Sequence, residues 1–402
     1  DLAIFKAKNG NPVLYPDVMW YDELVKDHWM QNQQNLTISG GSAKVKYFTS
    51  FSHLREEGNF KEFKTPLDYS TSPSYSRYNF RARVGIDLTN TTNFEVNLAG
   101  RNEHRYSPAG MSEYNDPAGV VSNGIEGLVG RALKMPSWAA PFFKEYINSD
   151  DPKVIALDGN YNHIVNYGLG GVNAFNPYAL LTYGGYAFTD NNIAESIFTV
   201  RQKLDFITKG LSLKAQFGYD ATQLSGKLQR GSTGYLELNR STLALTPVGG
   251  TYNDFFGAPA YSRSGFTKTN LQLFLTYGRS FGKHNLSANL IGQRELQGSA
   301  AAAAPYANQG IISEATYNYG NKYFLTASAT YNGSENYAKG YRYGFFPAAT
   351  IGYNLANEEW MKKLTWISML KIRGSIGRVG IPSPGTSRFY YQIRFGAGAN
   401  VV

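Results

Sequence analysis

Histidine is the residue type in this sequence best suited to metal or acid–base chemistry, and its spacing argues against both. His28, His53, His104, His163 and His284 are scattered along 402 residues without the short intervals that metal ligands use, so we interpret them as structural or solvent-exposed. Nor does the sequence suggest a converging acid, base and nucleophile. We therefore predict no metal site, no catalytic residues, no cofactor and no enzymatic activity.

Cationic side chains are stronger candidates, for binding rather than catalysis. Those of interest lie in segments where apolar residues alternate with polar ones, always on the polar side: Arg81, Arg83, Arg201, Lys203, Lys214 and Arg373. Lined up inside a channel, they would create a field that favours anionic or strongly polar solutes. They could equally pair with carboxylates such as Asp87 and Glu95 across the wall of the channel, or contact a domain inside it. The sequence leaves both interpretations open.

Aromatic side chains in the longest polar connections form a second set of binding candidates. They stand among Asn, Asp and Gly residues, and the set comprises Tyr106, Trp138, Tyr161, Tyr167, Tyr235 and Tyr252. Aromatic faces flanked by amides and carboxylates suit sugar rings or extended peptides. The alternative is that these rings pack the connections against each other or against a partner protein.

The elements that must position these residues are strands with strict alternation. In residues 78–88, Tyr78, Phe80 and Ala82 begin an apolar row, and Arg81 and Arg83 lie on the opposite side. Residues 323–331 and 345–353 repeat this pattern. A strand with one apolar face ending in aromatic residues, and one face of small and polar residues, is what separates lipid from a watery lumen.

Composition agrees with membrane strands and excludes several other classes. The chain has 30 Tyr, 24 Phe and 42 Gly but only 17% charged residues, and we find no run of about 18 apolar residues that would form a membrane helix. The absence of Cys excludes a disulfide framework. The net charge of +9 is dispersed rather than gathered in a patch, so we do not expect nucleic-acid binding.

The connections between about twelve predicted strands alternate between short and long. We expect a lead-in over residues 1–34, with a turn and a short helix, followed by barrel strands over residues 35–402. The long connections cover residues 54–77, 101–196, 220–268, 293–310 and 332–344. Outer-membrane barrels have short periplasmic turns and long external loops, so this alternation predicts the orientation of the strands. Residues 355–368 break the rule on the short-turn side, and residues 357–364 read as a short helix.

Several separated motifs resemble one family. The chain is similar to the SusC/RagA group of TonB-dependent outer-membrane transporters of Bacteroidota, through WYDEL at 20–24, NLTISGG at 35–41, YNFRAR at 78–83, GFFPA at 344–348 and LKIRGS at 370–375. The resemblance spans residues 20 to 380 and implies a barrel of about 22 strands around an N-terminal plug. Neither a plug nor a TonB box is visible before Trp20, so we expect a barrel segment whose plug domain is not in this sequence.

The predicted fold is thus all-β, an antiparallel transmembrane β-barrel segment in the bacterial outer membrane. The resemblance implies TonB-dependent import of oligomeric nutrients, either glycans or peptides. The implied partners are a SusD-like surface lipoprotein as lid, the TonB complex, the lipid bilayer with its lipopolysaccharide, and an oligosaccharide or peptide substrate. A passive porin or structural outer-membrane barrel is the alternative, and a soluble β-sandwich adhesin is a more distant one.

Overall fold

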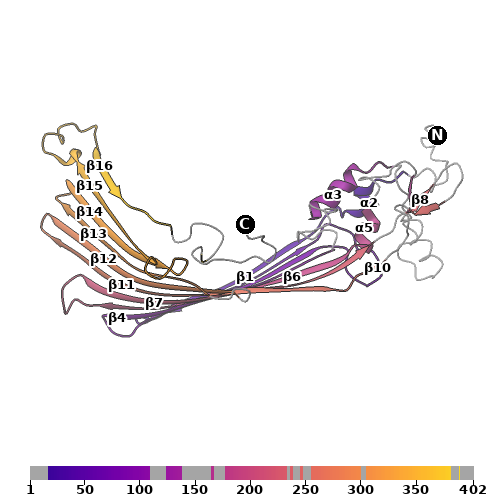
Figure 1. Cartoon of the computed structure of the whole chain (residues 1–402), viewed down its shortest axis with the longest axis horizontal. Helices are drawn as coiled ribbons and strands as arrows, with labels where there is room; N and C mark the ends of the chain where they lie inside the picture. Colours follow the sequence, from indigo (N-terminus) through magenta and orange to yellow (C-terminus); the bar gives the residue numbers. More distant parts are fainter. Residues whose placement is uncertain are drawn as a thin grey trace, which may run out of the picture.

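One long antiparallel sheet dominates the computed structural model (Figure 1), which describes residues 17–108, 124–137, 164–166, 177–232, 236–238, 245–247, 255–299, 305–381 and 389. Its strands follow each other in chain order. They are β1 Gln31–Gly41, β2 Val45–Glu57, β3 Ser74–Asp87, β4 Thr92–Pro108, β6 Gly185–Lys203, β7 Leu211–Ser232, β11 Ala260–Phe281, β12 His284–Ser299, β13 Tyr306–Tyr319, β14 Tyr323–Ser334, β15 Tyr343–Asn354 and β16 Lys371–Gly377. The two-residue strand β10 (Phe255–Phe256) pairs with β7, and β5 (Ile164–Asn166), β8 (Leu236–Leu238) and β9 (Leu245–Pro247) form a separate small sheet.

Register confirms the two faces predicted from alternation. Across β14 and β15, Leu325 lies opposite Ile351 and Tyr331 opposite Phe345, while Thr326 lies opposite Thr350 on the other face. Leu325 and Ile351 are 46% and 65% exposed, although they are the most apolar residues of their strands. Because exposed apolar rows are costly in water but favourable in lipid, we call this side the outer face and the opposite side the polar face.

The strands reach further into the long connections than the apolar pattern predicted. In the connection expected over residues 101–196, β4 continues to Pro108 and β6 begins at Gly185. The first strand likewise begins at Gln31, inside the predicted lead-in of residues 1–34, and Gln31 pairs with Glu56. The physical reason is that alternation of apolar residues ends where lipid ends, whereas the backbone hydrogen-bond ladder continues beyond it.

A small apolar core lies at the end of the sheet that carries the long connections. Helices α2 (Trp20–Leu24), α3 (Gly124–Lys134) and α5 (Pro177–Tyr183) gather there, at the right of Figure 1. Trp20, Leu24, Phe60, Leu128 and Tyr178 are almost fully buried and pack together. We call this cluster the cap core. The predicted short helix in the lead-in corresponds to α2.

The opposite end consists mainly of tight turns. Between β13 and β14, Gly320 and Asn321 both have positive φ, 59° and 56°, a left-handed pair that suits a tight hairpin. The connection between β15 and β16 is longer, and the helix predicted over residues 357–364 is wrong. A 3-10 helix, η3 (Leu355–Asn357), is followed by turns, because Met361, Leu364 and neighbouring backbone amides close short-range bonds instead of a helical ladder.

Among the described residues, none of the helices is both long enough and apolar enough to cross a membrane. A further weak strand pattern in the sequence, over residues 388–395, lies almost wholly outside the described residues.

Candidate polar-face site

The sheet brings the predicted cations onto its polar face. Arg83 lies opposite Asn97 between β3 and β4, Asn93 lies opposite Arg201 between β4 and β6, and Arg201 lies opposite Lys214 between β6 and β7. Arg81, Lys203 and Arg373 have the same parity within their strands. All six predicted cations therefore lie on the side opposite the outer face.

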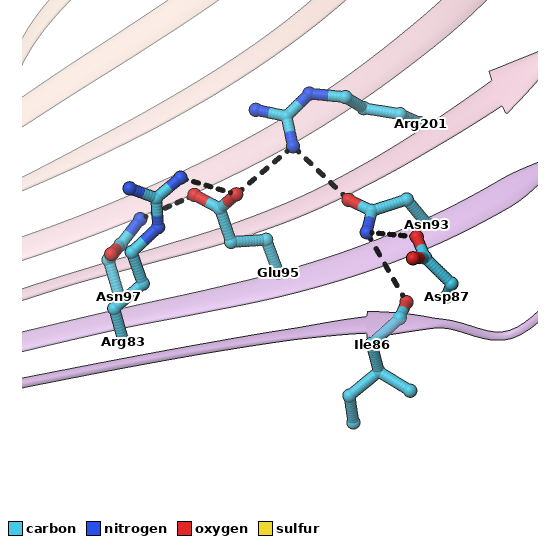
Figure 2. A network of polar contacts seen from close by, with 7 residues as sticks. All are labelled: Arg83, Ile86, Asp87, Asn93, Glu95, Asn97 and Arg201. Atoms are coloured by element: carbon cyan, nitrogen blue, oxygen red, sulfur yellow. Dashed lines mark hydrogen bonds and ion pairs between the residues drawn. The ribbon is translucent and has the colours of Figure 1, made fainter. Parts of the chain in front are cut away.

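Glu95 is the centre of a charge cluster on this face (Figure 2). Its Oε2 atom accepts from Arg83 Nη2 at 3.0 Å and from Arg201 Nη1 at 3.2 Å, and its Oε1 atom accepts from Asn97 Nδ2 at 2.9 Å. The Glu95 side chain is only 11% exposed, whereas the two arginine side chains are about half exposed, at 59% and 47%. Three donors thus satisfy one nearly buried carboxylate. A carboxylate at this depth needs such partners, because burying an unpaired charge is costly.

Asn93 extends the cluster toward the short turn between β3 and β4. Its side-chain oxygen accepts from Arg201 Nη1 at 3.3 Å, and its nitrogen donates to Asp87 Oδ1 at 2.9 Å. Figure 2 shows Arg201 reaching from β6 over both Glu95 and Asn93. The result is a chain of polar contacts across three strands that fixes the orientation of two guanidinium groups.

The predicted cations differ in how far their charge is compensated. Arg83 and Arg201 both form ion pairs with Glu95, so for these two residues the structure agrees with the ion-pairing alternative. Lys214 lies over the ring of Phe274, with Nζ 3.6 Å from the ring centre. No ion pair involves Arg81, Lys203 or Arg373 within the described part of the chain. Two cations facing one carboxylate leave a positive surplus around Glu95, although Glu195 and Asp220 also lie on this face.

Of the six predicted aromatic contacts, the structure describes Tyr106 alone. Trp138, Tyr161, Tyr167, Tyr235 and Tyr252 lie outside the described residues. The Tyr106 hydroxyl donates to the Ser70 carbonyl at 2.7 Å, and its ring stacks on Tyr186 with centroids 6.2 Å apart. Tyr106 lies opposite Ser74 and Phe188. By parity it points to the side of the outer face, above the apolar rows, and it holds the β2–β3 connection against β6.

Next to Tyr106 is a polar cleft of about 650 Å³, lined by Lys26, Arg55, Glu62, Tyr69 and His104 among others. The Tyr69 hydroxyl donates to the Thr182 carbonyl at 2.5 Å and accepts from the Gly185 amide at 3.1 Å. Burial raises the pKa of the Tyr69 phenol, so it stays a neutral hydrogen-bonding group. Sequence reasoning missed Tyr69, because its partners are more than a hundred residues away.

Within the described residues, no three His, Cys, Asp or Glu side chains come close enough to hold a metal ion. The contacts available on the polar face are hydrogen bonds and charge pairs, which suit recognition of a polar solute in passage.

Comparison with known proteins gives consistent results. No family model matches the chain. TonB-dependent receptor P3 of Formosa agariphila is 25% identical over 397 residues, covering 90% of this chain and 34% of that receptor. TonB-dependent receptor P26 of the same organism is 22% identical over 385 residues, covering 92% of this chain and 34% of its own length. This chain thus spans about a third of the length of these curated relatives.

Among solved structures, the RagAB peptide importer in its open-open state is similar with a TM-score of 0.60 and 18% identity, covering 92% of this chain and 39% of that chain. Its closed-closed state gives a TM-score of 0.58 at the same identity. At this identity the likeness shows the fold, and it confirms the predicted barrel segment.

Proposed function

We propose that this chain, whose resemblance to the SusC/RagA-type TonB-dependent receptors is confirmed by its curated relatives, forms part of the wall of a nutrient importer in the outer membrane. The imported solutes are oligomeric, either glycans or peptides, and the chain itself carries out no covalent chemistry. The observation that carries the proposal is the division of one sheet into an apolar outer face and a locally positive polar face with oriented arginines.

The proposal includes the partners implied by the resemblance. A SusD-like lipoprotein closes the chamber from outside, TonB supplies energy through a plug domain, and the long connections point outward. The cap core lies on the side of the long connections and supports this arrangement, because it packs parts of those connections into a folded unit. RagAB, which shares the fold, is a peptide importer, and this likeness supports a peptide cargo for the present chain.

The class of transporter is tested by uptake in cells. Fluorescent oligosaccharides and oligopeptides of matched size are offered to cells that carry the protein, with and without TonB. Uptake of either solute that depends on both the protein and TonB supports the proposal. Uptake that continues unchanged without TonB would establish the alternative, a passive porin.

The role of the polar-face charge is tested at Arg81. Arg83 shares Glu95 with Arg201, so replacing it would also disturb the cluster, whereas Arg81 is exposed and has no ion pair among the described residues. We expect Arg81→Gln to lower uptake of anionic solutes several-fold relative to neutral ones. Arg279→Gln on the outer face is the matched control. Equal selectivity in both variants would show that the charge serves structure alone.

The aromatic side chains of the long connections remain proposed substrate contacts. For Tyr106 the structure supplies a specific test, because its hydroxyl holds the β2–β3 connection. If Tyr106 contacts substrate through its ring, Tyr106→Phe should keep binding and Tyr106→Ala should weaken it. If the residue only anchors the connection, both variants should loosen the connection and leave binding unchanged.

A further inference from the structure

A groove of about 920 Å³ crosses the outer face between β2 and β12. Its floor is a row of directly paired residues in successive strands: Phe80 lies opposite Gly100, Gly100 opposite Ala194, and Ala194 opposite Ala221. A Cβ added at Gly100 would meet only the Ile193 carbonyl, at 3.9 Å. The floor is thus hollow because its side chains are small, while the large ring of Phe80 stands at one end.

The row beside this floor is polar. Asn102 Nδ2 donates to Asn192 Oδ1 at 2.6 Å, which links β4 to β6. With its amide oriented to accept, Gln223 takes hydrogen bonds from Arg263 Nε at 3.3 Å and from Nη2 at 3.1 Å. Arg263 is exposed and forms no ion pair within the described part of the chain. Asp190, a nearby carboxylate on the same face, is occupied by His104 at 2.6 Å.

The groove has an apolar end and a cationic end at different heights. Strands of membrane barrels are tilted by about 35–45°, so a row of paired residues climbs obliquely relative to the membrane plane. Phe80 lies midway along β3, within the apolar rows, whereas Arg263 lies near the end of β11 that is far from its short turn at Phe281. The groove therefore runs from the hydrocarbon region to the head-group region.

We propose that this groove binds lipid A, the phosphorylated anchor of lipopolysaccharide, with an acyl chain over the Gly100–Ala194–Ala221 floor and a phosphate on Arg263. Continuity with the lipid-facing outer face supplies the hydrophobic part of the site. The guanidinium, a planar donor suited to phosphate and already oriented by Gln223, supplies the polar part. The inference rests on the orientation in the proposed function, which places the Arg263 end in the outer leaflet.

The test uses the intact protein extracted from outer membranes into detergent. Native mass spectrometry measures retention of added lipid A, of dephosphorylated lipid A and of phosphatidylethanolamine. We expect lipid A to be retained at least tenfold better than either comparison lipid. Arg263→Glu should remove that preference, whereas Arg279→Glu, on the same strand and face but beside the short turn, should keep it.

A second pair of variants tests the acyl-chain floor without changing charge. Ala194→Trp should fill the groove and lower lipid A retention several-fold, while Ala288→Trp, on the outer face outside the groove, should not. Equal retention of lipid A and phosphatidylethanolamine, or equal loss in both variants of either pair, would overturn the proposal. Loss in Arg279→Glu alone would also overturn it, because Arg279 lies outside the groove. Uptake assays on the same variants report separately on transport.

Discussion

The cap core and the outer face use the same residue types in opposite ways. In the cap core, Trp20 is 1% exposed and Phe60 is fully buried. On the outer face, Leu325 is 46% and Ile351 is 65% exposed. The cap core packs apolar side chains against each other, as a water-soluble domain does, whereas the outer face leaves them for a solvent that is itself apolar.

This difference teaches that hydrophobic burial stabilises only the end of the sheet that projects into water. Within the membrane, lipid covers the apolar rows, and stability comes from the continuous hydrogen-bond ladder and from avoiding polar groups on that face. Substitutions in the two regions should therefore destabilise the protein by different mechanisms. Three experiments test this.

The largest expected effect is in the cap core. Trp20→Ala should remove about 3–5 kcal/mol from the local unfolding free energy, because it leaves a large cavity among Leu24, Phe60 and Tyr178. Hydrogen exchange of the Val25 and Lys61 amides, which bond to the Tyr21 and Leu24 carbonyls, reports this opening.

The control for that variant is Trp29→Ala. Trp29 belongs to the same segment but is 53% exposed, so its loss should leave the Val25 and Lys61 amides as protected as before. If Trp20→Ala instead unfolded the whole sheet in membranes, the cap core and the membrane strands would be one cooperative unit, and the contrast between the regions would fail.

The second effect concerns the outer face. Leu325→Arg should cost roughly 1–3 kcal/mol in lipid, because an arginine on the lipid face, between the tyrosine row at Tyr323 and the middle of the hydrocarbon, is poorly solvated. Thr326→Arg, one residue along β14 and on the polar face, should cost far less. Urea unfolding in liposomes measures both. Equal costs would mean that the two faces are not separated into lipid and lumen.

The contrast between lipid contact and core packing also explains which parts of the fold the sequence predicted. Alternation in residues 78–88 and 323–353 predicted the two faces of the strands, since lipid imposes a period of two. The extension of β4 to Pro108 and of β6 back to Gly185 was missed, because beyond the lipid the ladder persists without apolar alternation. The cap core was missed because it joins Trp20 to Leu128 and Tyr178 across long stretches of chain.

The polar-face site was predicted in part. Parity placed Arg83 and Arg201 on one face and suggested Glu95 as a partner, but strand register decides which carboxylate each arginine meets. Register depends on turn lengths and on pairing across three strands, which alternation within one strand does not encode. Arg263 carried no signal in the sequence, because its surroundings come from β7 and from the groove beside it.

The smallest expected effect lies at the short-turn end, where polar contacts replace a core. Glu358 accepts from Lys322 Nζ at 2.9 Å and from the Tyr353 hydroxyl at 3.0 Å, and these bonds hold the pKa of Glu358 below its usual range. Because the folded pKa is lowered, this contribution is fully present above the ordinary pKa of 4.5 and is lost as pH falls through the folded value.

The β15–β16 connection should therefore loosen below about pH 4.5. Trp360 and Trp366, both exposed in this connection, report the loosening by fluorescence. Glu358→Gln should show the loosened signal already at pH 7 and little further change on acidification. The protection of the Val25 amide should stay constant over the same range, because apolar packing does not titrate. If Glu358→Gln kept the full acid transition, other carboxylates would be responsible for it. The contacts of Glu358 would then not stabilise the short-turn end.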